Sequence, residues 1–492
     1  GRGACVFTQR QTDIITMFRK TAFSAAALLA MAGANPAFAT NGMNLEGYGA
    51  KSHAMGGASM AFDTGNSAVM NNPATLGYMK EGTSEIGVGI RGLHPDIDLA
   101  YGPYKDSSSA TAFYMPSLSY MRKDGAITWG AAVLSQGGMG AEYGPGSSVF
   151  GYGKSMNGVS SAALSGLTNR SEVGVGRVMF PLAWQVSKET NIGITADFVW
   201  ASMDLQMDID GDHFRRFTQN NGGSLGGTMY TALAGMLGPG TGKIYDINYT
   251  RVDFSNGSPW IGQAVGYGTG VKIGFTQKLG NSVTVGGSYH SRTAMSDLET
   301  TRASMTFGGS MDDGSKAFTQ TVTGKVKVKD FEWPATWAFG AAVTPNDRWL
   351  LAADVKWIDW SSVMDKFSME FTADNTSANG GYAGKVLDMT MTQDWKDQAV
   401  WSFGAQYKAT KKLALRGGAS FSTNPVSNRY LNPLFPAIIE NHYTCGFGYQ
   451  LNDASTVAAA FSWAPKVTEI NGDNLAVSHS QTNWSLNFTH KL

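Results

Sequence analysis

The sequence is poor in cysteine and in charge. It contains 2 cysteines among 492 residues, Cys5 and Cys445, which excludes a fold held together by several disulfides. Charged residues make up 15% of the chain, well below the roughly 25% usual in soluble domains. Basic and acidic residues balance at 38 each, and this lack of a basic excess argues against nucleic-acid binding.

The N-terminal region has the pattern of an export signal. A basic stretch at 17–20 precedes a short apolar run at 21–34, and Ala37 and Ala39 form a small-x-small cleavage site. The run is shorter than the roughly 20 residues of a spanning helix. We therefore predict an upstream extension at 1–16, a signal peptide at 17–39 and a mature N-terminus at Thr40. The chain from Thr40 onward has 34 basic and 37 acidic residues.

Beyond the signal the chain lacks any long apolar run, which excludes a helical membrane protein. Alternating segments are present instead. In 399–408, for example, Trp401 and Phe403 alternate with Ser402 and Gln406. This period of two is typical of a strand with one apolar face, which meets the core in a soluble sandwich and lipid in an outer-membrane barrel. The export signal and unequal connections favour the barrel.

Short turns, as at 123–125 and 279–281, alternate with long connections, as at 210–263 and 300–323. Bacterial barrels have short periplasmic turns, long outer loops and an even number of strands. We predict an all-β, 14-stranded antiparallel transmembrane β-barrel over 83–492. The predicted strands are 84–99, 111–122, 126–143, 172–187, 191–209, 263–278, 282–299, 323–345, 348–371, 397–409, 412–426, 440–451, 455–470 and 478–492.

The segment between signal and barrel is rich in glycine, alanine and serine, and it ends in Asn72-Pro73-Ala74. Proline fixes its own φ and pushes Asn72 toward an extended conformation. Such a segment cannot form a core of its own. We predict that 40–82 is an N-terminal hatch inside the barrel lumen, with Asn72, Pro73 and Ala74 as its motif.

Two long loops carry apolar side chains that suit substrate capture. Methionine and aromatic side chains repack around ligands of varied shape. The alternative, compatible with capture, is that the loops bury their own apolar faces. The predicted capture residues are Tyr230, Leu233, Met236 and Leu237, which recur at helical spacing, and Met305, Phe307 and Phe318.

Polar chemistry is sparse. Lys272, Lys356 and Arg416 lie on the predicted inner face, where they would hold a substrate carboxylate or form salt bridges with Asp197 and Asp354. The seven histidines show no metal-ligand spacing, and no nucleophile elbow is expected. We predict no catalytic residue, no metal site and no cofactor.

The chain resembles the FadL/TodX-type outer-membrane transporters of long-chain fatty acids and hydrocarbons. The resemblance covers 41–492 and rests on the Gly-Ala-rich N-terminal segment, Asn72-Pro73-Ala74, Trp395-Lys396-Asp397 before a strand and Asn424-Pro425-Val426 after one. It implies a hatch, external capture loops, an inward Arg416 and a lateral opening where the third strand kinks, at Gly137, Gly138 and Gly140. Without the resemblance, these glycines would merely end a strand at the outer rim.

The resemblance implies passive uptake of fatty acids or hydrocarbons across the outer membrane of a Gram-negative bacterium. Each CH₂ group prefers an apolar site by about 0.8 kcal/mol, so the carrier must offer apolar sites. Expected partners are a hydrophobic small molecule, outer-membrane lipid and lipopolysaccharide, and the barrel-assembly machinery; no nucleic acid is expected, and the protein should be a monomer. A polar-solute porin is the alternative, followed by a surface adhesin or an outer-membrane lipolytic enzyme.

Overall fold

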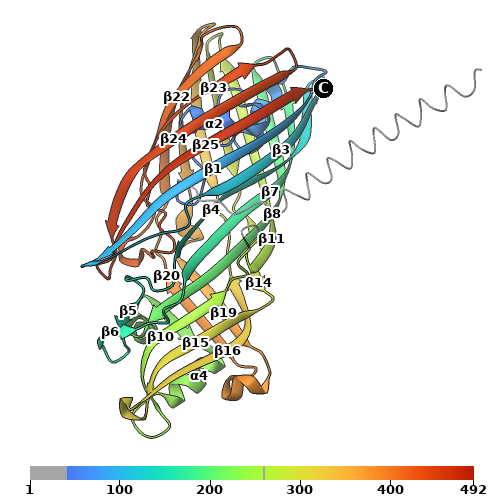
Figure 1. The fold of residues 1–492 in the computed structure, drawn as a ribbon. Helices are drawn as coiled ribbons and strands as arrows, with labels where there is room; N and C mark the ends of the chain where they lie inside the picture. The colour runs from blue at the N-terminus through green and yellow to red at the C-terminus, as the bar shows by residue number, and fades with distance from the viewer. Residues whose placement is uncertain (1–40, 259–260) are drawn as a thin grey trace, which may run out of the picture.

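The structure, a computed structural model, describes residues 41–258 and 261–492. The predicted signal peptide and its cleavage site lie outside the described residues. Among those residues, no helix is both long enough and apolar enough to cross a membrane. Antiparallel strands dominate the fold (Figure 1).

A closed circuit of antiparallel pairings forms a barrel, seen in the upper part of Figure 1. Each strand of the circuit pairs with the next, and the last, β25, pairs back with β1. Closure leaves the circuit without a free sheet edge. In order of pairing the strands are β1 (Ser84–Tyr101), β3 (Phe113–Asp124), β4 (Ile127–Tyr143), β7 (Asn169–Gln185), β8 (Thr190–Asp210), β11 (Ala264–Leu279), β12 (Val283–His290), β17 (Thr336–Asn346), β18 (Trp349–Ile358), β21 (Gln398–Lys408), β22 (Leu413–Ser422), β23 (Asn441–Gln450), β24 (Ser455–Ile470) and β25 (Ala476–Lys491).

Further strands extend the same sheet beyond this circuit and form the outer part, at the bottom of Figure 1. From β8 the pairing continues through β10 (Ile244–Phe254), β15 (Ala303–Met311), β16 (Lys316–Lys329), β19 (Lys366–Ala373), β20 (Val386–Thr392) and β9 (Gly223–Gly226). The remaining strands are β2 (Tyr104–Ser107), β13 (Ala294–Met295), β14 (Leu298–Thr300) and the separate pair β5 (Tyr152–Lys154) and β6 (Ser160–Ala163). The helices of this part are α3 (Gly211–Thr218) and α4 (Gly227–Met236), with short η3 (Asp312–Gly314), η4 (Trp360–Ser362), η5 (Ser377–Tyr382) and η6 (Asn428–Tyr430).

The prediction of an all-β closed barrel is confirmed. The predicted total of 14 strands is wrong, because the sheet has 23 strands among the described residues, and several of those outside the closed circuit were read as loops. The segments read as loops at 210–263 and 300–323 contain strands that pair with the sheet. The predicted strand 323–345 is in fact the end of β16 and most of β17, separated by a break that contains Asp330, with φ +54°, and Pro334. The predicted strand 348–371 is likewise divided by η4, and 282–299 contains β12, β13 and β14.

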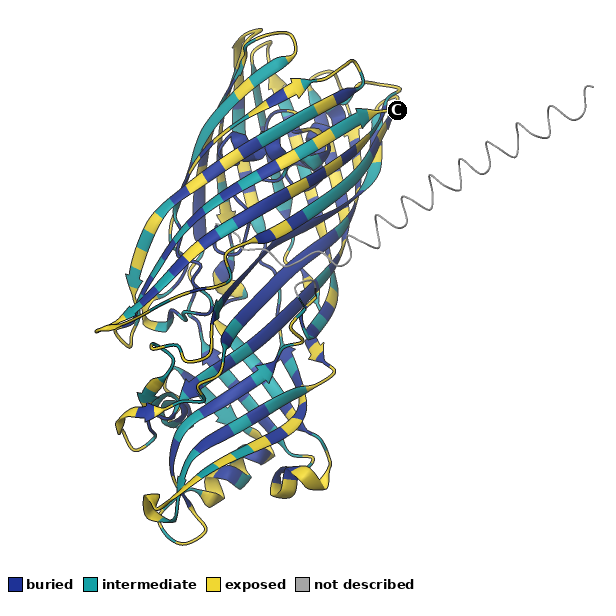
Figure 2. Cartoon of the chain, viewed as in Figure 1, coloured by how far each residue is buried: buried dark blue, intermediate teal, exposed yellow. Residues whose placement is uncertain are grey.

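Along strand β8 the types of residue that face outward and inward change. From Ile192 to Phe198 the outward side chains are apolar and exposed, while Thr195 and Asp197 point inward and are buried. Beyond Trp200 the pattern inverts, because the buried inward residues are apolar and the outward ones are polar. The first pattern fits a wall in lipid with a polar lumen, and the second fits a wall in water with an apolar interior. Figure 2 shows exposed and buried residues alternating along the strands.

Residues 41–79 lie within the closed circuit, where Figure 1 draws helix α2 (Gly49–Ala54). The segment continues through η1 (Gly65–Val69) and η2 (Pro73–Tyr78), and most of its residues are buried. Hydrogen bonds join it to separate strands of the wall. Ser59 N donates to Asp354 of β18 at 2.6 Å, and Ala50 N donates to Asn487 of β25 at 2.6 Å.

Candidate functional site

The wall of the barrel has one long interruption, between β3 and β4. Strand β3 pairs with β4 only from Leu118 opposite Val133 to Asp124 opposite Ile127, although β4 continues to pair with β7 as far as Tyr143. Within the described residues, 134–143 of β4 therefore have a strand partner on one side only. Residues 132–141 are nevertheless buried, so neighbouring side chains fill the interruption.

A bulge in β4 marks the start of this unpaired stretch. Ser135 pairs with Gly176 and Gly137 with Val175, which leaves Gln136 without an opposite residue on β7. Bulges bend a strand and release backbone groups from the ladder. The released groups find partners in the N-terminal segment.

Two contacts supply those partners. The Tyr48 hydroxyl donates to the Gln136 carbonyl at 2.7 Å, and Gly138 N donates to the Met43 carbonyl at 3.1 Å. A Cβ on Gly137 would lie 2.0 Å from the Met43 oxygen, so only glycine permits this approach. Higher on β4, Ser109 N closes the interruption by donating to Glu142 O at 2.8 Å.

A buried ionic network holds the bulge from inside. Arg177 of β7 donates from Nε to the Gln136 side chain at 2.5 Å and from Nη1 to Asp197 at 2.8 Å. Asp197 also contacts His290 at 2.6 Å, and Arg177 Nη2 reaches Thr293 at 2.6 Å. Buried charges are tolerated when they are paired and hydrogen-bonded in this way. The network fixes where β4 leaves the ladder.

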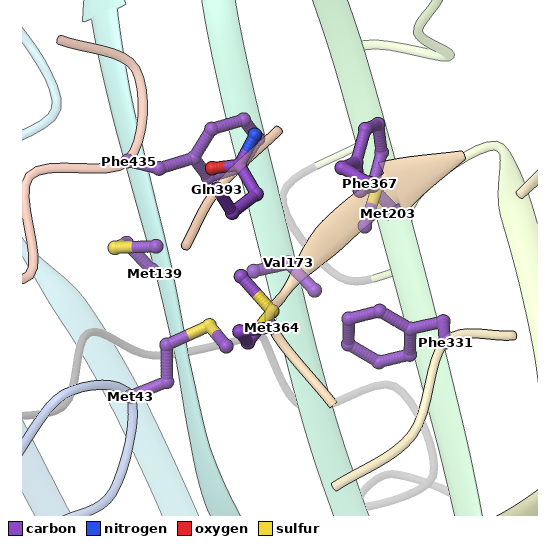
Figure 3. A pocket seen from close by; sticks show the side chains of 9 residues that line it. All are labelled: Met43, Met139, Val173, Met203, Phe331, Met364, Phe367, Gln393 and Phe435. Atoms are coloured by element: carbon purple, nitrogen blue, oxygen red, sulfur yellow. The ribbon is translucent and has the colours of Figure 1, made fainter. Parts of the chain in front are cut away.

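An apolar cavity lies against the unpaired stretch of β4. Figure 3 shows side chains from widely separated segments converging on it. Met139 of β4 and Met43 of the N-terminal segment contribute to its wall, so the cavity adjoins both the bulge and the segment inside the barrel. It is lined by Met43, Met139, Val173, Met203, Phe331, Met364, Phe367, Gln393 and Phe435.

A second apolar cavity lies in the outer part. Strand β19 connects the two, because Phe367 lines the first and Met369 and Phe371 line the second. Alternate residues of a strand share a face, so these three side chains form one apolar track. The second cavity is lined by Val252, Met305, Val326, Met369, Phe371, Leu387 and Met389.

The predicted capture residues lie in this outer part, and most of them are covered. Leu233 of α4, Met305 and Phe307 are buried, and Tyr230, Leu237 and Phe318 are half-buried. Met236 is exposed, and the Tyr382 hydroxyl lies 3.6 Å from its sulfur. Among the seven, Met305 lines a cavity. The arrangement is that of loops burying their own apolar faces, with Met236 left at the surface.

Ion pairs and indole rings hold the start of the N-terminal segment. The buried Glu46 carboxylate contacts Arg91 of β1, lies 3.0 Å from His53 and accepts from Ser462 of β24 at 2.8 Å. Trp333 Nε1 donates to the Asn44 side chain at 2.9 Å. Its ring contacts Trp360, which contacts Trp395, with centroids 5.7 and 5.3 Å apart.

The predicted hatch motif lies against β8 and β11. Asn72 caps η2 by accepting from Ala74 N at 3.1 Å, and its amide donates to the Phe275 carbonyl of β11 at 3.0 Å. A Cβ on Gly193 of β8 would lie 2.5 Å from Ala74 N. The structure therefore does not bring Asn72-Pro73-Ala74 to the glycines of β4, whose contacts are with Met43 and Asn44.

The predicted basic residues of the lumen line neither cavity. Lys272 donates to the Met70 carbonyl, and Arg416 donates to Gln406 at 2.8 Å. Lys356 is half-buried on β18. The expected aspartate partners bind elsewhere, since Asp197 pairs with Arg177 and Asp354 accepts from Ser59 N.

Sequence reasoning missed the cavity residues, because they come from separate segments that only the fold brings together. It also missed Gln136, Tyr48 and the Arg177 network. Arg177 could have been noticed, because it is an arginine within a strand of alternating sequence. In the sheet it lies two residues from Met179, the residue that pairs with Asp197. Among the described residues, no cluster of histidine, cysteine and carboxylate side chains could hold a metal ion.

Known proteins with this architecture include solved transporters. The toluene transporter TodX of Pseudomonas putida is 27% identical, with 91% of this chain and 99% of that chain covered at a TM-score of 0.74. The toluene transporter TbuX of Ralstonia pickettii is 26% identical over 91% and 99%, at a TM-score of 0.70.

A curated relative from Chlorobium limicola is an uncharacterized protein encoded in the 5′ region of a phosphoenolpyruvate carboxykinase gene. It is 73% identical over 103 residues, 21% of this chain. The chain spans about half the length (50%) of that relative. The model of the family described as outer membrane protein transport protein (OMPP1/FadL/TodX) matches residues 24–490, and the chain therefore belongs to this family.

Proposed function

We propose that the protein passes hydrocarbon-like compounds from the outer part through the two apolar cavities and releases them sideways into the membrane between β3 and β4. The family makes the protein an outer-membrane transporter of hydrophobic compounds in Gram-negative bacteria and not an enzyme. Similar solved proteins are described as toluene transporters, which supports a hydrocarbon cargo.

The observation that carries the lateral route is the unpaired stretch of β4. A wall strand without a partner on one side can separate from its neighbour there without breaking a ladder on that side, and here Met139 of that strand lines the first cavity. Transfer between apolar sites retains about 0.8 kcal/mol for each CH₂ group that water would otherwise contact. A ligand leaving the cavity past β4 would enter lipid directly.

We further propose that residues 41–79 act as the hatch. Support comes from their hydrogen bonds to separate strands of the wall and from the buried ion pair of Glu46 with Arg91. A lumen filled in this way leaves polar solutes no open path, which disfavours the porin alternative. We propose that the protein acts as a monomer, with lipid, lipopolysaccharide and the barrel-assembly machinery as its other partners.

The lateral route can be tested with the double variant Gly138→Val and Gly140→Val. These positions share the strand face opposite Met139, so the added side chains should block movement of β4 past β3. We expect the variant to insert and to bind toluene, but to lose most uptake of radiolabelled toluene by cells. Gly144→Val is the matched control, because a Cβ there meets nothing within 4 Å.

Insertion is checked by the shift in gel mobility on heating, which a closed hydrogen-bonded barrel shows. Normal uptake by an inserted double variant would overturn the lateral route and favour passage past residues 41–79 toward the periplasm. If Gly144→Val also lost uptake, the loss in the double variant would not be specific to Gly138 and Gly140. That result would count equally against the lateral route.

A further inference from the structure

One polar side chain lines the first cavity, that of Gln393, between β20 and β21. It is 6% exposed, and Figure 3 shows its amide among the methionine and phenylalanine side chains. Its backbone N–H donates to the Asp365 carbonyl at 2.9 Å. The side-chain amide forms no hydrogen bond within the described part of the chain, and no charged side chain lines the cavity.

An amide that is enclosed by apolar side chains and has no partner is costly. A water molecule needs two to four polar partners to be held in a cavity, and this cavity offers one residue. The group that best satisfies Gln393 is therefore on the ligand. A hydroxyl suits either orientation of the amide, because it both donates and accepts.

We propose that this cavity selects hydrophobic compounds that carry a single neutral hydroxyl, of the phenol or alcohol class. This inference rests on the proposed function, since it defines the substrate class of the same cavity. A hydrocarbon of equal size leaves the Gln393 amide unpaired. A carboxylate brings a charge that no lining residue can neutralise, and an unpaired buried charge costs more than an unpaired dipole.

The test uses two compounds of nearly the same shape, p-cresol and p-xylene, which differ by a hydroxyl in place of a methyl group. Their binding to the detergent-solubilised full chain is measured by equilibrium dialysis against detergent alone. The ratio of the p-cresol affinity to the p-xylene affinity is compared between the native protein and Gln393→Leu. We expect this ratio to fall about tenfold in the variant, the equivalent of one neutral hydrogen bond.

Gln393→Met serves as a second variant of similar length, and Gln219→Leu, at the exposed residue that follows α3, is the control that should leave the ratio unchanged. The 4-methylbenzoate anion should bind poorly to all four proteins. An unchanged ratio in correctly inserted Gln393→Leu and Gln393→Met would overturn this inference alone. If the native protein bound neither p-cresol nor p-xylene, the proposed function would fall as well.

Discussion

The Tyr48 hydroxyl donates a hydrogen bond of 2.7 Å to the carbonyl of Gln136, the bulged residue of β4. This contact joins the segment inside the barrel to the point where the wall loses its ladder. A carbonyl released from a sheet must find another donor when it is buried. The bulge and the N-terminal segment therefore stabilise each other, and loosening one should loosen the other.

Replacing Tyr48 with phenylalanine tests this coupling. The substitution leaves the ring in place but removes the donor, so the Gln136 carbonyl is left buried and unpaired at a cost of about 1–3 kcal/mol. We expect faster hydrogen exchange in residues 41–48 and in 134–141 of β4. Tyr143→Phe is the matched control, because its hydroxyl donates to Pro433 at 3.0 Å and does not contact residues 41–79. Equal changes in both variants would argue against the coupling.

Deleting residues 41–79 tests their role as a hatch. The barrel pairings lie outside this segment, so the shortened chain should still insert and show the heat-dependent mobility shift. We expect it to conduct small ions and polar solutes in a planar bilayer, whereas the intact chain conducts little. Similar conductance of the two proteins would contradict the hatch and raise the porin alternative.

The barrel wall could be predicted because the lipid-facing signal is local. Trp401 and Phe403 face outward and Ser402 inward, as the alternation indicated. The outer strands were missed because their apolar side chains face inward, whereas those of the lipid-facing wall face outward. In β15, Met305 and Phe307 point into an apolar interior, and they were read as loop residues exposed for capture. Both kinds of alternation are present in the sequence, but the sequence does not show at which residue a strand passes from lipid into water.

The candidate site could be predicted only in part. The resemblance to the family implied a kink at Gly137, Gly138 and Gly140, which the residues alone did not indicate, and the structure shows a bulge and an unpaired stretch of β4 there. The cavity itself depends on contacts between residues as distant as Met43 and Phe435, for which a single sequence has no signal. Gln393 is likewise an ordinary polar residue in the sequence and becomes distinctive only when apolar side chains surround it.

A pH effect is expected at the outer end of the barrel, where His213 of α3 lies between two carboxylates. Its Nδ1 is 2.7 Å from Asp210 and its Nε2 is 3.0 Å from Asp473. Burial lowers the pKa of His213, but the hydrogen bonds and charges of Asp210 and Asp473 outweigh it and raise the pKa to about 9. The His213 ring is thus protonated at neutral pH.

Because this pKa is raised above the ordinary value of 6.5, the stabilisation is fully present below pH 6.5 and is lost as the pH rises through about 9. We expect α3 to exchange its amide protons more readily, after correction for intrinsic rates, between pH 8 and 10. NMR titration of the His213 ring should give a lower pKa in Asp473→Asn. An unchanged pKa in that variant would contradict the ion pair.

The last prediction concerns where β8 leaves the membrane. Ile194 is 47% exposed on the outward face, and Gln206, on the same face of the same strand, donates to Asp253 at 3.0 Å. If the wall passes from lipid into water near Trp200, a lysine at position 194 should cost about 2–4 kcal/mol of folding free energy. A lysine at position 206 would lie beside the Asp253 carboxylate and should cost less than about 1 kcal/mol. Reversible unfolding in lipid vesicles measures both variants. Equal costs would mean that positions 194 and 206 lie in the same environment. The change of pattern near Trp200 would then not mark the membrane boundary.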